Sequence, residues 1–259
     1  MIERDETLGD ARLILGNALN VLPALSADHI IGDPPYEDEL HNATRRGLRQ
    51  DSGAELRPPG FAGVNADRAA IAAACVEASQ GWVILFSLAE GVRAWRDDLQ
   101  AAGARWDTTC AWVKPDAAPR FNGQGPARGF EAFVTCWAGT GYRRWNGGGK
   151  RGVYTHTVNP PGRDGHHPTE KPLALMREII RDFTQPGEVV CDPFMGSGAT
   201  GVAALMEGRR FIGIDADPAW FGVARDRISA AAGLFDGAAE PSLFASLPKA
   251  RRPARVGAS

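Results

Sequence analysis

Short apolar segments alternate with segments of helical length along most of this chain, and this alternation constrains the fold more than any other feature. The runs at 82–87 and 211–214 have the length and the β-branched and aromatic content of buried strands. The segments at 90–102 and 172–183 are long enough to form helices. Strands that alternate with helices at this spacing form a mostly parallel sheet with helices on both faces. The sequence therefore predicts a doubly wound α/β fold.

The predicted elements follow one another from residue 11 to residue 231. We expect strands at 11–15, 28–32, 82–87, 106–113, 132–137, 189–191 and 211–214. We expect helices at 18–25, 66–79, 90–102, 172–183, 199–207 and 219–231. The polar segment 37–65 lacks periodicity and is predicted to be a long loop. The composition after residue 236 predicts a disordered tail at 237–259, so the domain is expected to span residues 1–236.

Composition excludes several classes of protein. A chain of 259 residues has room for one large α/β domain. The cysteines are far apart and form no Cys-x-x-Cys pair, which argues against a zinc site or a disulfide framework. No apolar stretch is long enough to span a bilayer, and residues 1–10 are too acidic for a secretion signal. We therefore expect a cytoplasmic protein without a metal site or a membrane segment.

Basic residues are concentrated between residues 114 and 163, although the whole chain has a formal net charge of −2. The only acidic residues of this Gly-rich segment are Asp116 and Glu131. A basic segment on an acidic body is typical of an insert that binds a polyanion, and a solvated loop is the alternative. The candidate contact residues are Arg143, Arg144, Lys150 and Arg151, with Arg45 and Arg46 in the long loop.

A glycine-rich loop at 192–198 follows a predicted buried strand and opens a predicted helix. Its small residues would let the backbone approach a ligand, and a helix N-terminus offers N–H groups to an anion. Asp215 ends the next strand, where a carboxylate grips a ribose in nucleotide-binding α/β folds. Gly196-x-Gly198-x-x-Gly201 also matches the dinucleotide fingerprint. Only one further strand and helix follow it, however, which disfavours a nicotinamide fold; a purely structural turn is the other alternative.

The tetrapeptide Asp33-Pro34-Pro35-Tyr36 lies at the carboxyl end of a predicted strand, where ligands bind in open α/β sheets. Its prolines lack N–H groups and leave carbonyls to accept hydrogen bonds. A carboxylate and a carbonyl could draw the two N–H bonds of an aromatic amine out of the ring plane. The nitrogen lone pair could then attack a methyl group held in line, which is catalysis by positioning. A rigid turn with a buried tyrosine is the structural alternative.

The tetrapeptide together with Asp192-Pro193-Phe194-Met195-Gly196-Ser197-Gly198 resembles the amino-DNA methyltransferases that modify adenine N6 or cytosine N4. The tetrapeptide comes first, the basic segment second and the glycine loop last, as in the permuted group called beta. The resemblance covers about residues 11–231. It implies the Rossmann-like methyltransferase sheet, S-adenosylmethionine as cofactor, double-stranded DNA as partner and a nucleoid-associated location. It also implies that segment 114–163 is a target-recognition insert.

The resemblance also implies roles for individual residues. The tetrapeptide would hold the target: Asp33, Pro34 and Pro35 would engage the amine, and Tyr36 would stack on a base flipped out of the duplex. The cofactor would be held by residues of five segments: Asn17, Asp33, Thr169, Lys171, Asp192, Phe194, Gly196, Ser197, Gly198 and Asp215. In this set, Asn17 replaces the usual aspartate near the cofactor's adenine. Thr169 and Lys171 belong to His-Pro-Thr-x-Lys-Pro and would lie near the cofactor carboxylate.

The target base and the remaining partners are less constrained. Aspartate at position 33 resembles the adenine enzymes, whereas serine is commoner in the N4-cytosine enzymes, which are the alternative. Methyltransferases of RNA or protein, a further alternative, usually place the cofactor loop first, so the order of motifs in this chain disfavours them. Cytosine-carbon methylation is excluded because no cysteine follows a proline. The tail segment 240–244 resembles peptides that dock on the bacterial sliding clamp; the alternative is that Leu243 and Phe244 pack against the body of the enzyme.

Overall fold

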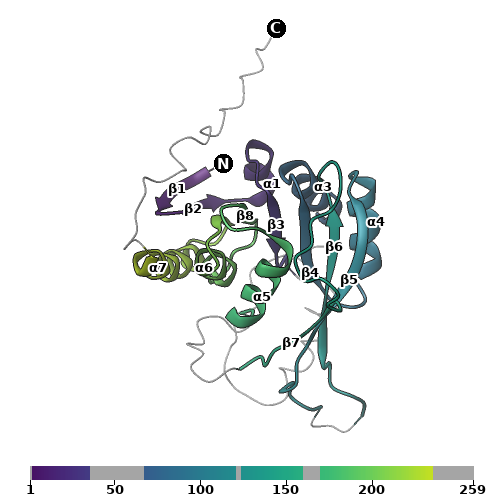
Figure 1. Cartoon of the computed structure of the whole chain (residues 1–259). Helices are drawn as coiled ribbons and strands as arrows, with labels where there is room; N and C mark the ends of the chain where they lie inside the picture. The colour runs from purple at the N-terminus through teal and green to yellow at the C-terminus, as the bar shows by residue number, and fades with distance from the viewer. Residues whose placement is uncertain (1, 36–66, 121–123, 160–169, 236–259) are drawn as a thin grey trace.

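The computed structural model describes residues 2–35, 67–120, 124–159 and 170–235 (Figure 1). Its strands are β1 (Ile2–Leu8), β2 (Ala11–Gly16), β3 (His29–Gly32), β4 (Trp82–Ser87), β5 (Arg105–Val113), β6 (Phe130–Trp137), β7 (Val153–Thr155), β8 (Val189–Asp192) and β9 (Arg210–Asp215). Its helices are α1 (Ala18–Val21), the 3-10 turn η1 (Leu22–Ala24), α3 (Arg68–Ala78), α4 (Val92–Ala101), α5 (Leu173–Phe183), α6 (Ala199–Met206) and α7 (Pro218–Phe235).

The strands of these described segments form one sheet in the order β1-β2-β9-β8-β3-β4-β6-β5-β7. The central strands β2, β9, β8, β3 and β4 run parallel. β6 is antiparallel to β4 and to β5, whereas β7 is parallel to β5 and β1 is antiparallel to β2. The carboxyl ends of the parallel strands therefore meet at one edge, together with the start of β6 and the end of β5. We call this the carboxyl edge and the opposite one the amino edge.

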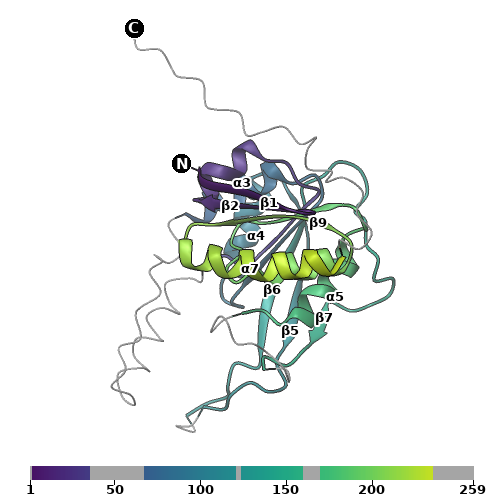
Figure 2. The same ribbon diagram turned by 90° about the vertical axis from the view of Figure 1, so that its left-hand side faces the viewer.

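Helices cover both faces of the sheet, which confirms the predicted doubly wound class (Figures 1 and 2). α5, α6 and α7 pack on one face, and their buried side chains join one core cluster with Phe86, Phe133 and Phe211. α1, α3 and α4 pack on the other face around a second cluster that includes Trp95 and Leu99. Because the central strands β3, β4, β8 and β9 are buried on both faces, their sequences are nearly continuous apolar runs rather than alternating ones.

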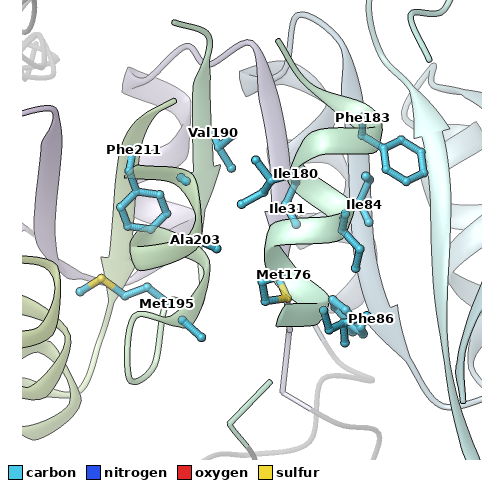
Figure 3. Packing of buried hydrophobic residues seen from close by; sticks show 14 of the residues in the cluster. Ile31, Ile84, Phe86, Met176, Ile180, Phe183, Val190, Met195, Ala203 and Phe211 are labelled. Atoms are coloured by element: carbon cyan, nitrogen blue, oxygen red, sulfur yellow. The ribbon is translucent and has the colours of Figure 1, made fainter. Parts of the chain in front are cut away.

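Helix α5 covers the centre of the sheet. Figure 3 shows Met176, Ile180 and Phe183 on the side of α5 that faces Ile31 of β3 and Ile84 of β4. Both isoleucines and Ile180 have no measurable solvent exposure. This contact fixes α5 over β3 and β4, so that the residues just before α5 lie at the carboxyl edge, next to the end of β3.

Some predicted boundaries differ from the structure. The predicted helix 18–25 is only the four-residue α1 followed by η1, because Pro23 lacks the N–H that would continue an α-helix. β1 and β7 were not predicted. β1 is a polar strand at the rim of the sheet, and β7 has only three residues, so neither has a recognisable apolar pattern. The predicted loop 37–65 and tail 237–259, with its clamp-like peptide, lie outside the described residues, and those predictions stay untested.

In the described parts of segment 114–163, the chain adds β6 and β7 to the same sheet. The target-recognition role of this segment remains a prediction. None of the helices in the described ranges is both long enough and apolar enough to cross a membrane.

Replacing Ile180 by alanine should lower the free energy of unfolding by about 2–5 kcal/mol, because it leaves a cavity between α5 and the sheet. Val153, 51% exposed on β7, is the matched aliphatic control, and its replacement by alanine should cost less than about 1 kcal/mol. Urea denaturation followed by circular dichroism measures both values. Equal losses in the two variants would contradict the central position of α5.

Candidate functional site

Three aspartates meet at the carboxyl edge because three neighbouring parallel strands end there. Asp33 follows β3, Asp192 ends β8 and Asp215 ends β9. Asp192 is 2% exposed and Asp215 is 9% exposed, which is unusual for carboxylates. The structure thus brings together the tetrapeptide and the glycine loop, which are about 160 residues apart in the sequence.

Two of these carboxylates fix the glycine loop at 193–198. Asp192 accepts hydrogen bonds from the backbone N–H of Phe194 (2.9 Å) and from the hydroxyl of Thr200 (2.6 Å). Asp215 accepts one from the backbone N–H of Gly196 (2.8 Å). These bonds replace the water that buried carboxylates lose, and they hold the loop at the start of α6.

Gly198 is required by the geometry of this loop. Its φ of 83° is in the left-handed region, where residues with a Cβ are strained. A Cβ at this position would also lie 3.1 Å from the Cα of Ala224 in α7. The positive φ and the close approach to α7 together favour glycine at this position of the loop.

An arginine that the sequence analysis did not single out ties this loop to the segment before α5. Arg227 of α7 donates to the backbone carbonyl of Ser197 (2.7 Å) and to Glu170 Oε1 (2.6 Å). Glu170 precedes Lys171 in the His-Pro-Thr-x-Lys-Pro element, at the position where that pattern specifies no residue. Arg227 lies three residues after Ala224 and thus on the same face of α7. That helical periodicity is the signal that could have identified it.

A chain of alternating charges surrounds the tetrapeptide carboxylate. Lys171 Nζ lies 2.6 Å from Asp33 Oδ2 and 2.8 Å from Glu131 Oε1. Lys114 Nζ lies 2.7 Å from Glu131 Oε2. Lys171 and Glu131 are 6% and 5% exposed. The other oxygen of Asp33, Oδ1, is buried and has no hydrogen-bond partner in the described part of the chain.

Antiparallel pairing brings Glu131 and Lys114 to this position. Glu131 is the second residue of β6 and pairs with Trp112 of β5, and Lys114 follows the last residue of β5. In the sequence, both residues are recognisable only as charges of the basic segment. Glu131 directly precedes the predicted strand 132–137 and lies two residues before Phe133. An extension of that strand by two residues would have placed Glu131 on the same face as Phe133, since strand residues two apart share a face.

Burial raises the pKa of all three aspartates at the site. It raises the pKa of Asp33 to about 6 against the opposing effect of Lys171, and it raises the pKa of Asp192 to about 7 and that of Asp215 to about 6. Burial acts in the same direction on Glu131, but the charges of Lys171 and Lys114 outweigh it and lower the pKa of Glu131. The buried carboxylate held between two ammonium groups thus stays ionised, while burial keeps the pKa of Asp33 close to neutral pH.

The remaining predicted site residues have various positions. Pro34 is buried and Pro35 is half-buried after β3. Asn17 follows β2 at the same edge, and its Oδ1 accepts the backbone N–H of Leu19 (2.9 Å), so it caps α1. Tyr36 and Thr169 lie outside the described residues. Lys171 contacts the carboxylates of Asp33 and Glu131; its predicted contact with a cofactor carboxylate stays a prediction.

The predicted polyanion contacts are not gathered at this site. Arg143 pairs with Asp107 (2.5 Å) and Arg144 with Glu188 (2.7 Å). The carbonyl of Arg144 also accepts the indole N–H of Trp82, the first residue of β4, so these arginines lie at the amino edge.

The other candidate cations differ in their surroundings. Lys150 is held by Glu178 (2.6 Å) and Asp182 of α5, and Arg151 is exposed. Arg45 and Arg46 lie outside the described residues. The predicted role of all these cations in binding a polyanion stays a prediction. Within the described segments, no group of His, Cys, Asp and Glu could hold a metal ion.

Because the pKa of Asp192 is raised in the folded protein, the free energy of unfolding should depend on pH. A carboxyl whose pKa is higher in the folded state stabilises below its unfolded pKa of about 4, and this stabilisation is lost as the pH rises through about 7. Asp192→Asn does not titrate, so relative to the wild type it should gain up to about 1.4 kcal/mol per pH unit over this window. Urea unfolding at a series of pH values measures the difference. Asp226→Asn, at an exposed site on α7, is the control, and parallel curves for Asp192→Asn and the wild type would contradict the prediction.

Comparison with known proteins agrees with this geometry. The sequence profile of the N6/N4 DNA methylase family matches residues 27–225. The type II methyltransferase M2.DpnII of Streptococcus pneumoniae is 52% identical over 66 residues, which are 26% of this chain and 25% of that protein. The type II methyltransferase M.XycI of Xanthomonas campestris pv. cyanopsidis is 33% identical over 141 residues, which are 50% of this chain and 46% of that protein. The chain thus matches less than half the length of either relative.

Solved structures share the fold. The complex of M1.HpyAVI with SAM has a TM-score of 0.66 and 24% identity and covers 84% of this chain and 98% of that one. The cytosine-N4-specific PvuII DNA methyltransferase has a TM-score of 0.63 and 14% identity and covers 90% of this chain and 95% of that one. The matched residues 27–225 contain the tetrapeptide after β3 and the glycine loop after β8. This chain belongs to the N6/N4 amino-DNA methyltransferase family.

Proposed function

We propose that this protein transfers a methyl group from S-adenosylmethionine to the exocyclic N6 amine of an adenine in double-stranded DNA. The observation that carries the proposal is Asp33 Oδ1, a buried carboxylate oxygen without a hydrogen-bond partner in the described residues. A buried acceptor of this kind costs free energy unless a ligand supplies its donor. An amine N–H of a flipped-out base is such a donor.

The residues around Asp33 suit this reaction. Pro34 and Pro35 contribute carbonyls and no N–H groups, so the amine meets acceptors only. When bound, S-adenosylmethionine supplies an electrophilic methyl group on a sulfonium. As the N–C bond forms and the S–C bond breaks, the amine nitrogen becomes positive and must lose a proton. Asp33 is ionised above its raised pKa of about 6, and in this mechanism its Oδ1 stabilises that charge and receives the proton.

The glycine loop fits the cofactor. Gly196 and Gly198 both have positive φ, and their lack of side chains lets the backbone approach the methionine end of the cofactor, together with Asp192, Phe194 and Ser197. Asp215 accepts backbone N–H groups from Gly196 and Asp217, one on each oxygen. Each carboxylate oxygen has a second lone pair, which can accept a ribose hydroxyl.

Adenine is favoured over cytosine by the carboxylate at position 33. The alternative is methylation of cytosine N4, because the PvuII enzyme, which shares the fold, is cytosine-N4-specific. The match to the DNA methylase family and to type II methyltransferases favours DNA over RNA or protein as substrate.

Product analysis tests this proposal. Unmethylated genomic DNA treated with the protein and deuterium-labelled S-adenosylmethionine should yield labelled N6-methyladenine after digestion and mass spectrometry. Asp33→Asn should reduce the rate at least about a hundredfold with cofactor affinity nearly unchanged, because the amide places a donor where the amine needs an acceptor. Asp226→Asn is the control. Label found only in N4-methylcytosine would show that the target is cytosine N4 and not adenine N6. Near-normal turnover by Asp33→Asn would show that Asp33 has no part in the mechanism.

The surface that meets DNA should adjoin the carboxyl edge, where the target amine must enter. The turn between β5 and β6 lies there and carries Arg120 and Arg128, both exposed. We expect these arginines to contact phosphates.

Two double variants compare the two edges. Arg120→Ala with Arg128→Ala should weaken DNA binding and reduce the slope of log K against log salt by about 2. Arg143→Ala with Arg144→Ala removes the same charge from the amino edge and should leave this slope unchanged. Fluorescence anisotropy over a salt series measures both. The reverse pattern would move the DNA surface to the amino edge, as the clustering of arginines in the sequence suggested.

A further inference from the structure

The proposed chemistry gives Glu131, a member of the charge chain beside Asp33, no role of its own. A second carboxylate near Asp33 raises the pKa of Asp33, and this opposes the ionised state that the reaction needs. Glu131 is also 5% exposed, so its burial has a cost of its own. A buried acid that makes the ionisation of Asp33 less favourable needs another function.

Geometry indicates what that function is. Lys171 has its ammonium between Asp33 Oδ2 and Glu131 Oε1 and lies over the ring of Phe86, 4.8 Å from its centroid. Glu131 is held in turn by Lys114, whose ammonium lies 4.2 Å from the ring centroid of Trp112. Each charge is therefore fixed by an opposite one, from β5 and β6 to the end of β3. Asp33 Oδ1 is left outside this chain of contacts.

We propose that Glu131 is a positioning residue for methyl transfer, which holds Lys171 on the Oδ2 side of Asp33 so that Oδ1 stays available to the target amine. This inference rests on the proposed role of Asp33. An ammonium has three donors and would otherwise bind both oxygens of a nearby carboxylate. With Glu131 as its second partner, Lys171 orients Asp33 without competing for the reactive oxygen.

The first test separates the rate of methyl transfer from cofactor binding. Glu131→Gln keeps the size of the side chain but turns one of its oxygens into a donor, which faces an ammonium. The single-turnover rate at saturating cofactor should fall about a hundredfold, as expected for a misplaced reacting group, with the cofactor Kd within about threefold of the wild type. Glu178→Gln is the control because Glu178 also pairs with a lysine, Lys150, and lies outside the site. Its rate should stay within about twofold of the wild type.

The second test is the pH dependence of that rate. The charged groups that face Asp33 are Lys171, Glu131, Lys114 and Asp192. Loss of the Glu131 charge lowers the pKa of Asp33, so Glu131→Gln should shift the acid limb of the rate profile to lower pH. Loss of the Lys171 charge raises that pKa, so Lys171→Met should shift the limb to higher pH. Shifts in opposite directions are not expected from a general loss of stability.

A double variant separates positioning from folding. Lys171→Met alone leaves Asp33 and Glu131 with fewer counter-charges, whereas adding Glu131→Gln removes one buried charge and should recover thermal stability. If the rate is lost because Asp33 is no longer oriented, the double variant stays slow although it is folded, since it has no ammonium to hold Asp33 Oδ2. Recovery of the rate together with stability would overturn the proposal, as would wild-type rates for Glu131→Gln. If Asp33→Asn is fully active in the same assay, the role of Asp33 on which this inference rests fails, whereas a wild-type protein that forms no N6-methyladenine would refute the proposed function itself, which is a distinguishable result.

Discussion

The common direction of β2, β9, β8, β3 and β4 is the constraint on which the rest of this structure depends. Parallel strands need helical crossovers, and these cover both faces, so the carboxyl edge is where polar side chains can meet. Asp33, Asp192 and Asp215 all occupy it. Neither the tetrapeptide nor the glycine loop has a function by itself; the sheet brings them together.

Burying several carboxylates at one edge is costly, and the structure offsets that cost differently for each. Asp192 and Asp215 accept hydrogen bonds from backbone N–H groups of the glycine loop, and Asp192 also accepts one from the hydroxyl of Thr200 in α6. The same hydrogen bonds that stabilise these carboxylates therefore fix the loop. Asp33 is instead held by an ammonium on one oxygen only. In the proposed mechanism, this difference separates the carboxylates that fix the glycine loop from the carboxylate that keeps an acceptor for the substrate.

Charge that is clustered in the sequence is dispersed in the fold. The basic segment looks like one polyanion-binding unit, yet Lys114 lies beside Glu131 at the carboxyl edge while Arg144 pairs with Glu188 at the amino edge. The antiparallel β6 runs from one edge to the other and separates them. Net charge along a chain therefore indicates the kind of partner better than the place where it binds.

The sequence by itself determined the fold class, the family and the residues at the ends of β3, β8 and β9, because apolar runs and turn residues are local signals. It did not reveal the polar strand β1 or the three-residue strand β7, because such strands form only when they pair with a neighbouring strand. Only the tertiary structure decided that Glu131 and Lys114 join Asp33 and that Arg227 ties the glycine loop to Glu170. These contacts join residues far apart in the chain, and strand order and helix packing, which no local pattern specifies, bring them within hydrogen-bonding distance.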